Sequence, residues 1–131
     1  MVWKNWQVSA LAALFTLAVL CGVRADDVKP TDEGKAATFK GKTVEMRDKG
    51  EFAILLEFSA GKEITATTNG PNETDVNLFV YDENKKEVAK DTSPGPKCEV
   101  KFTPAKGGKC KLRVTNSGGK NKVTLKVKVA K

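Results

Sequence analysis

The stretch Asp75-Val76-Asn77-Leu78-Phe79-Val80-Tyr81-Asp82 carries the clearest secondary-structure signal in this 131-residue chain. Residues at alternate positions share one face of a β-strand. One face of this segment would therefore carry two valines and a leucine, and the other would include a phenylalanine and a tyrosine. Because both faces are apolar enough to need at least partial covering, the segment is expected to be a central strand of a sheet.

Similar short segments recur on both sides of this stretch, with Gly, Pro, Asn and Asp between them. The predicted strands are 38–46, 51–58, 62–68, 75–82, 87–90, 98–103, 109–115 and 122–129. Helical periodicity of 3.6 residues is not found after residue 25. About eight short strands at this spacing predict an all-β domain, built as a sandwich or a barrel.

The first 25 residues are expected to be a secretory signal peptide that is cleaved after Ala25. Lys4 supplies the positive charge, residues 10–21 form an apolar run, and small residues precede the cleavage point. A membrane anchor is one alternative, but a spanning helix needs about 20 apolar residues and this run is shorter. A lipid-modified Cys21 is another. Cleavage would leave no transmembrane segment and would make the protein secreted or periplasmic.

Residues 26–35 are polar and predict a flexible leader before a single domain at 36–131. Two cysteines, Cys98 and Cys110, lie within that domain. In the oxidising environment outside the cytoplasm, such a pair predicts a disulfide. The alternative is two buried free thiols, because each cysteine shares its strand face with apolar neighbours.

The residue types argue against catalysis. The chain contains no histidine, which is the commonest general base and metal ligand. The serines after residue 25 lie in predicted turns without a neighbouring base motif. We therefore expect no enzymatic activity and assign no catalytic residue.

Asp75, Asn77 and Asp82 form a candidate metal site, because calcium prefers oxygen ligands of this kind. They lie at the two ends of one predicted strand, and the helix–loop–helix calcium pattern is not met. The alternative is that these side chains stabilise the adjoining turns. No cofactor other than calcium is expected.

The C-terminal third of the chain is strongly basic, within a formal net charge of +7. Residues 109–129 predict a hairpin centred on Gly118 and Gly119, with its leucines and valines directed inward. The outward face of this hairpin would carry five basic residues, Lys109, Lys111, Arg113, Lys126 and Lys128. Such a face predicts binding to a polyanion, for example an acidic polysaccharide or lipopolysaccharide.

Nucleic acid is a disfavoured ligand for this basic face. Single-stranded nucleic acids are bound by aromatic side chains on which bases stack, and none is interleaved with these lysines in the sequence. The alternative to polyanion binding is that the lysines maintain solubility and protect exposed strands from edge-to-edge pairing.

Three motifs resemble those of the bacterial pre-peptidase C-terminal domain family. They are Leu55-Leu56-Glu57-Phe58-Ser59-Ala60-Gly61-Lys62-Glu63-Ile64, the Asp-led strand 75–82 that ends in Tyr-Asp, and Phe102-Thr103-Pro104 followed by Gly107 or Gly108. Cys110 stands where the family commonly has a tyrosine. The resemblance spans about residues 36–129 and implies a bacterial, jelly-roll-like antiparallel β-sandwich.

The resemblance further implies an exported, non-catalytic accessory or binding module. Its partner would be an anionic glycan or a secreted protein. The alternative is an envelope-associated structural protein that is held on an anionic surface by its basic C-terminal hairpin.

Overall fold

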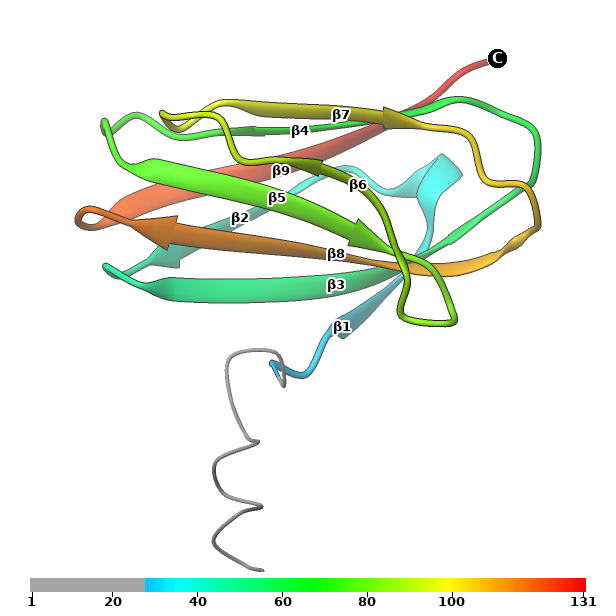
Figure 1. The fold of residues 1–131 in the computed structure, drawn as a ribbon, viewed down its shortest axis with the longest axis horizontal. Coiled ribbons are helices and arrows are strands. Elements are labelled where there is room, and N and C mark those ends of the chain that lie inside the picture. Colours follow the sequence, from blue (N-terminus) through cyan, green and yellow to red (C-terminus); the bar gives the residue numbers. More distant parts are fainter. Residues whose placement is uncertain (1–27) are drawn as a thin grey trace, which may run out of the picture.

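The computed structural model describes residues 28–131, which form two β-sheets packed face to face (Figure 1). One sheet has five strands in the order β1-β3-β8-β5-β6, and the other has four in the order β2-β9-β4-β7. The strands are β1 Thr31–Lys35, β2 Lys42–Met46, β3 Gly50–Phe58, β4 Ile64–Asn69, β5 Asp75–Tyr81, β6 Glu87–Asp91, β7 Cys98–Phe102, β8 Gly108–Ser117 and β9 Asn121–Val129. The predicted all-β sandwich is confirmed, and each predicted strand overlaps an observed one.

The predicted signal peptide and Cys21 lie outside the described residues. Within residues 28–131, no helix combines the length and the hydrophobicity that crossing a membrane requires. A short 3-10 helix (Ala36–Thr38) precedes β2 and includes Thr38, the first residue of the first predicted strand.

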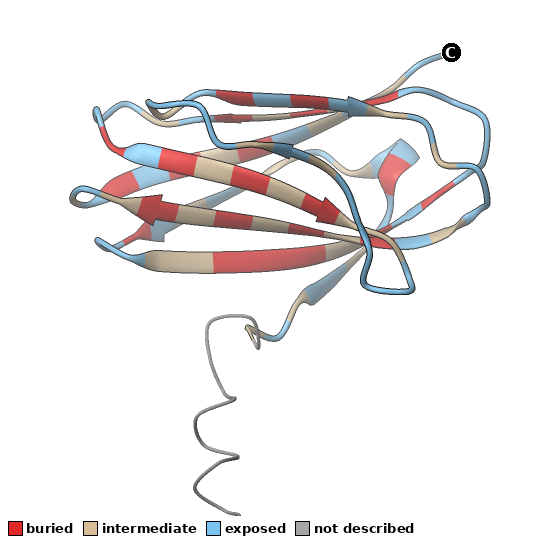
Figure 2. Ribbon diagram, in the orientation of Figure 1, coloured by how far each residue is buried: buried red, intermediate tan, exposed pale blue. Residues whose placement is uncertain are grey.

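The strand β5 lies between β8 and β6, so its prediction as a central strand is confirmed. Val76, Leu78 and Val80 are fully buried between the sheets, whereas Phe79 and Tyr81 are half-buried on the outer face. Figure 2 shows this alternation as buried and intermediate bands along β5. The period-two pattern of the sequence therefore decided which residues enter the core.

The core lies between the two sheets and is almost entirely aliphatic. Leu112 and Val114 of β8 face Val123 and Leu125 of β9 from the opposite sheet, and all four are fully buried. Burying aliphatic side chains of this size stabilises a fold by about 1.5–3 kcal/mol for each side chain, before the loss of chain entropy is counted.

The predicted hairpin of β8 and β9 is wrong, because the two strands belong to different sheets. β8 pairs with β3 and β5, and β9 pairs with β2 and β4. Between them the chain crosses from one sheet to the other through Gly118 and Gly119, both with positive φ. Alternation of apolar residues determines which face of a strand is buried, but it does not determine which strand lies beside it.

A buried polar network closes the corner where the chain crosses. The Asn116 side chain is 1% exposed, and its Nδ2 donates to the carbonyl oxygens of Arg47 (2.9 Å) and Gly119 (2.8 Å). Its Oδ1 accepts the Thr74 hydroxyl at 2.6 Å, and Asn121 Nδ2 donates to the Thr74 Oγ1 at 2.8 Å. These bonds supply partners to polar groups that would otherwise be buried without any.

The prediction that residues 26–35 form a flexible leader is wrong for Thr31–Lys35, which is the strand β1. This strand pairs with β3 in parallel and adds the one parallel pairing described in an otherwise antiparallel fold. The side chains of β1 are mostly exposed, so the strand needs no alternation of apolar residues. The periodicity of apolar residues in the sequence therefore could not predict this strand. Asp32 binds Lys109 at 2.8 Å and Glu33 binds Lys42 at 2.7 Å, which fastens β1 to both sheets.

Replacing the central residue of the corner tests its contribution to stability. Asn116→Ala would remove the acceptor of the Thr74 hydroxyl proton and one donor from each of two main-chain carbonyls, those of Arg47 and Gly119. We expect the free energy of unfolding to fall by about 2–3 kcal/mol. Urea denaturation followed by circular dichroism measures this change.

Asn84→Ala provides the matched control, because Asn84 is exposed in the turn after β5 and its side chain is not used by this network. We expect it to change the free energy of unfolding by less than about 0.5 kcal/mol. Equal effects of the two substitutions would show that the corner does not carry the stability assigned to it.

Candidate functional site

The five residues predicted to bind a polyanion are divided between two opposite surfaces. Lys109, Lys111 and Arg113 lie on β8 and face outward from the five-stranded sheet. Lys126 and Lys128 lie on β9 and face outward from the four-stranded sheet. Because the core separates the two groups, the single basic face predicted for a hairpin does not exist.

Two of the three basic residues on β8 are bound to carboxylates. The Arg113 Nε lies 2.8 Å from Glu51 Oε1, with side chains only 18% and 14% exposed, and Lys109 Nζ lies 2.8 Å from Asp32. Burial is the largest single influence and by itself lowers the pKa of Arg113, but the hydrogen bonds and charges of Glu51 and Tyr81 together outweigh it, so the pKa is raised. The hydrogen bond with Asp32 likewise raises the pKa of Lys109. Both cations therefore stabilise the domain itself.

The outer face of the five-stranded sheet also carries two aromatic rings beside the basic residues, contrary to the expectation from the sequence. Phe79 and Tyr81 stack with ring centroids 6.4 Å apart. Lys111 Nζ lies 5.7 Å from the Tyr81 centroid, and Arg113 Cζ lies 5.3 Å from that of Phe79. The stated reason for disfavouring nucleic acid is thus wrong, because β5 places aromatic side chains next to the basic ones on β8.

The outer face of the four-stranded sheet gathers four exposed lysines, which we call the lysine face: Lys101, Lys122, Lys126 and Lys128. The salt bridges found among residues 28–131 involve none of them. On β4, Thr67 pairs with Lys126 of β9. Thr65 pairs with Lys128 of β9 on one side and with Lys101 of β7 on the other. In the row of Lys101, Thr65 and Lys128, a threonine hydroxyl therefore lies between two lysines across three neighbouring strands.

Sequence reasoning missed Lys101 and Lys122. Both stand at outward positions of predicted strands, so the alternation of apolar residues could have assigned them to the outer face of a sheet. It could not show that β4 lies between β7 and β9, which brings Lys101 onto the same surface as Lys128.

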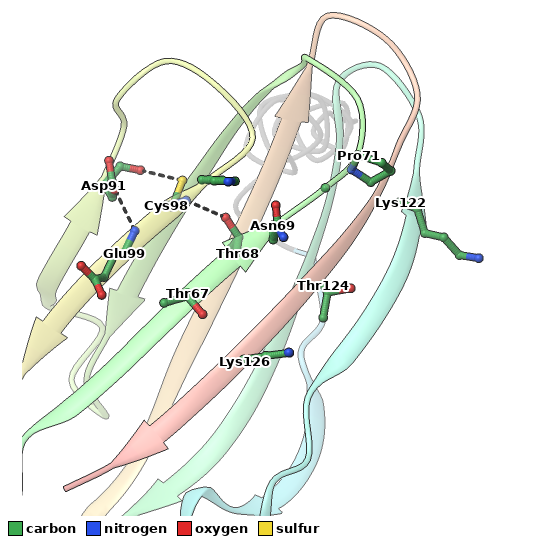
Figure 3. Close-up of a pocket in the computed structure, with 12 residues that line it drawn as sticks. Thr67, Thr68, Asn69, Pro71, Asp91, Cys98, Glu99, Lys122, Thr124 and Lys126 are labelled. Atoms are coloured by element: carbon green, nitrogen blue, oxygen red, sulfur yellow. Dashed lines mark hydrogen bonds between the residues drawn. The ribbon is translucent and has the colours of Figure 1, made fainter.

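A hollow of about 730 Å³ opens at one end of this surface (Figure 3). Thr67 and Lys126 project from neighbouring strands, and Thr124 and Lys122 follow along β9. Glu99 stands on β7 at the other side of Thr67. The hollow thus combines ammonium groups and hydroxyls with two carboxylates, those of Glu99 and Asp91.

Asp91 shapes the edge of this hollow. Its carboxylate accepts the backbone N–H groups of Ser93 (2.9 Å) and Glu99 (2.8 Å), which ties the end of β6 to β7. Partial burial raises the pKa of Asp91, but the hydrogen bonds from Ser93 and Glu99 outweigh it, and the pKa lies below its ordinary value. Asp91 is therefore a structural carboxylate.

The predicted disulfide is wrong, because Cys98 and Cys110 are free, buried and in different sheets. The Cys98 thiol donates to the carbonyl of Val76, near the start of β5, at 2.9 Å. Cys110 lies near the other end of β5, because the residue after it, Lys111, pairs with the last residue of that strand, Tyr81. Six residues of strand separate these points, or about 20 Å. A disulfide needs Cα atoms within about 7 Å.

Both thiols are protonated at neutral pH. Burial is the main cause that raises the pKa of Cys98. Burial, together with the charges of Asp82 and Glu83, raises the pKa of Cys110 to about 11. The structure therefore supports the alternative to the disulfide, in which both cysteines are buried free thiols that pack as small hydrophobic side chains.

The candidate metal residues do not converge. Asp75 and Asp82 flank β5 at opposite ends, and Asn77 faces outward between them. Asp82 Oδ1 accepts the N–H groups of Asn84 (2.8 Å) and Lys86 (2.9 Å), so it stabilises a turn as the alternative proposed. Within residues 28–131, no group of three or more Cys, Asp or Glu side chains is placed to hold a metal ion.

Comparison with solved structures places this fold among known domains. The chain is similar to the pre-peptidase C-terminal domain of a collagenase from Bacillus anthracis, with a TM-score of 0.61 and 18% identity over 82% of this chain and 100% of that one. The predicted resemblance to such domains is confirmed at the level of the fold. No protein-family model matches the sequence, and the search of curated proteins returned no match.

Two further structures share the fold. One is a surface-associated copper-binding protein of Methylomicrobium album, with a TM-score of 0.62 and 10% identity over 78% of this chain and 99% of that one. The other is a periplasmic inhibitor of g-type lysozyme from Aeromonas hydrophila, with a TM-score of 0.53 and 13% identity over 77% and 99%. At these identities the likeness concerns architecture and does not extend to ligands.

The burial of the thiols has a direct chemical consequence. In a Cys21→Ser background, we expect Cys98 and Cys110 to resist alkylation by iodoacetamide at neutral pH and to react once the protein is unfolded in urea. Peptide mass spectrometry locates the modified residues. A peptide pair joined through Cys98 and Cys110 in the absence of reductant would contradict the structure.

The lowered pKa of Asp91 predicts a pH-dependent contribution to stability. A carboxyl whose pKa is lower in the folded state stabilises the protein above its unfolded pKa, and this stabilisation is lost as the pH falls through the folded pKa. We expect Asp91→Ala to reduce the free energy of unfolding by about 1–2 kcal/mol at pH 7. At pH values well below 4, the free energies of unfolding of the variant and of the unsubstituted protein should differ less than at pH 7.

Urea denaturation at neutral and acidic pH measures this difference. Glu63→Gln, at an exposed position after the turn that follows β3, serves as the control and should have little effect at either pH. A pH-independent loss for Asp91→Ala would show that the carboxylate charge is not responsible.

Proposed function

We propose that this protein is an exported, non-catalytic binding module that holds an anionic polysaccharide on the lysine face of its four-stranded sheet. The observation that carries the proposal is the set of four exposed lysines on one surface without carboxylate partners. On the opposite surface, Lys109 and Arg113 are bound to acids and are less available to a ligand.

The spacing of the lysine face suits a polymer better than a small anion. Side chains two residues apart on one strand, such as Lys126 and Lys128, lie about 7 Å apart. Lys101 lies two strands from Lys128, or about 10 Å away. A chain with a repeated negative charge can contact several of these ammonium groups at once, whereas a single small anion can contact only one or two.

The threonines give the same surface a means of recognising sugars. Thr65 stands between Lys101 and Lys128, and Thr67 stands between Lys126 and Glu99. Thr124 bonds Thr43 through the two hydroxyls at 2.8 Å. Each hydroxyl can donate and accept a hydrogen bond. Glu45 and Glu99 share the surface, so binding would depend on the positions of the ligand's charges as well as on their number.

The comparisons support a binding role outside the cytoplasm. Proteins of this fold include a surface-associated copper-binding protein and a periplasmic lysozyme inhibitor. The signal peptide predicted at residues 1–25 agrees with such a location. The inhibitor supports a secreted protein as the second candidate partner of this chain.

The alternative of an envelope protein held by a basic C-terminal hairpin loses its structural basis. Its basic residues lie on β8 and β9, which belong to different sheets and face opposite sides of the sandwich. We therefore assign the binding of an anionic polymer to the lysine face.

Retention on immobilised heparin tests the lysine face. We expect the triple substitution Lys101→Gln, Lys126→Gln and Lys128→Gln to lower clearly the salt concentration at which the protein elutes, because each lost contact reduces the number of counterions released on binding. Heparin serves as the probe for sulfated and carboxylated polysaccharides.

The matched control removes the same charge from other places. Lys35, Lys86 and Lys106 are exposed outside the lysine face, and their triple change to Gln alters the net charge equally. It should leave elution close to that of the unsubstituted protein. If both triple variants elute at the same salt concentration, binding follows net charge and the localised site is wrong.

A further inference from the structure

A second groove lies on the opposite side of the sandwich, across the outer face of the five-stranded sheet. It measures about 970 Å³. Its floor is a row of three residues in register on neighbouring strands, Leu55 of β3, Lys111 of β8 and Tyr81 of β5. One wall is the segment 28–30, and the other is the turn 82–85.

Both walls are held in place by contacts already described. The salt bridge between Asp32 and Lys109 fastens β1, and with it the segment 28–30 that leads into β1. Asp82 Oδ1 accepts the backbone N–H groups of Asn84, within the turn 82–85, and of Lys86, directly after it. The groove is therefore formed in advance of any ligand, which lowers the entropic cost of binding.

Lys111 is the unusual member of the floor. Its neighbours on β8, Lys109 and Arg113, each bind a carboxylate, but no salt bridge of residues 28–131 involves Lys111. Its ammonium group is half-buried and lies 5.7 Å from the centroid of the Tyr81 ring. A partly buried cation without an acidic partner favours an anionic group of a ligand at this point.

The rest of the lining is apolar and charged, with more basic than acidic residues. Besides Leu55 and Tyr81, the apolar side chains are Val28 and Pro30, and the rim adds Lys29 and Lys85. The two acidic residues, Asp82 and Glu83, lie on the turn 82–85, where Asp82 accepts N–H groups of its own turn and Glu83 Oε2 accepts the Lys109 N–H at 3.4 Å. A ligand that complements this groove carries an acidic side chain between apolar ones. We propose that the groove binds an extended acidic segment of a partner protein, with its carboxylate on Lys111 and apolar side chains against Leu55 and Tyr81.

Two other ligand classes fit the groove less well. Single-stranded nucleic acid needs successive aromatic platforms, and Tyr81 is the one ring among the residues lining this groove. A sugar needs several hydrogen-bonding groups around an aromatic ring, and here the Asp82 carboxylate is used by its own turn. Three of the four apolar lining residues are aliphatic, which favours contact with apolar side chains.

The single tyrosine of the chain gives a direct measurement. Incorporation of 3-fluorotyrosine places one fluorine signal in the whole protein, on the floor of the groove. The probe is a pool of capped hexapeptides with two glutamates among Leu, Val and Phe. We expect the fluorine resonance to shift and to saturate at millimolar or lower peptide concentration, and not to shift with the pool in which Gln replaces Glu.

Lys111→Gln should weaken binding of the acidic pool about three- to tenfold, the effect of losing one partly exposed ion pair. Lys128→Gln, on the lysine face, removes the same charge and should leave binding unchanged. Leu55→Ser should also weaken binding, which tests the apolar part of the floor independently. Dispersed amide spectra confirm that each variant is folded.

Three results would overturn the proposal: no fluorine shift with the acidic pool, equal affinity for Lys111→Gln, or a stronger response to oligogalacturonate or oligothymidylate. The last result would assign the groove to a sugar or a nucleic acid. Retention on heparin depends on the opposite surface, so the outcome here is independent of the function proposed for the lysine face.

Discussion

The architecture of this protein depends on the corner at which the chain leaves one sheet and enters the other. Asn116 is the inward-facing residue near the end of β8, and its amide binds main-chain carbonyls that no strand pairs at this point. Thr74 and Asn121 complete the network, so the loop before β5 and the start of β9 are joined to it. Since β8 and β9 lie inside their sheets, the relative placement of both sheets follows from this crossing.

The crossing also separates the basic residues that follow one another in the sequence. Those on β8 lie beside acidic and aromatic side chains of β3 and β5, and two of them form salt bridges, Arg113 with Glu51 of β3 and Lys109 with Asp32 of β1. Those on β9 face threonines of β4 and stay free of salt bridges among the described residues. Identical residue types thus have different surroundings, mostly ion pairs on β8 and, within residues 28–131, no salt bridge on β9, because the neighbouring strands differ.

Taken together, the two proposals describe a module with two independent binding surfaces. The lysine face would hold an anionic polymer, and the groove around Lys111 would hold a segment of a partner protein. The core between the sheets keeps the two surfaces apart, so both could be occupied at once. A domain of this kind would act by bringing a partner and a polymer together, which agrees with a non-catalytic role.

The sequence by itself determined the strands and their buried sides, because alternation of apolar residues is a local property: Val76, Leu112 and Leu125 face inward as predicted. Only the tertiary structure decided which strands are neighbours. It placed β9 beside β4 instead of β8, it separated Cys98 from Cys110, and it recruited the polar strand β1 to an exposed edge. The same choice brought Lys101 to Lys128 and Tyr81 to Lys111. Pairing depends on contacts between residues distant in the chain, and strand periodicity carries no information about them.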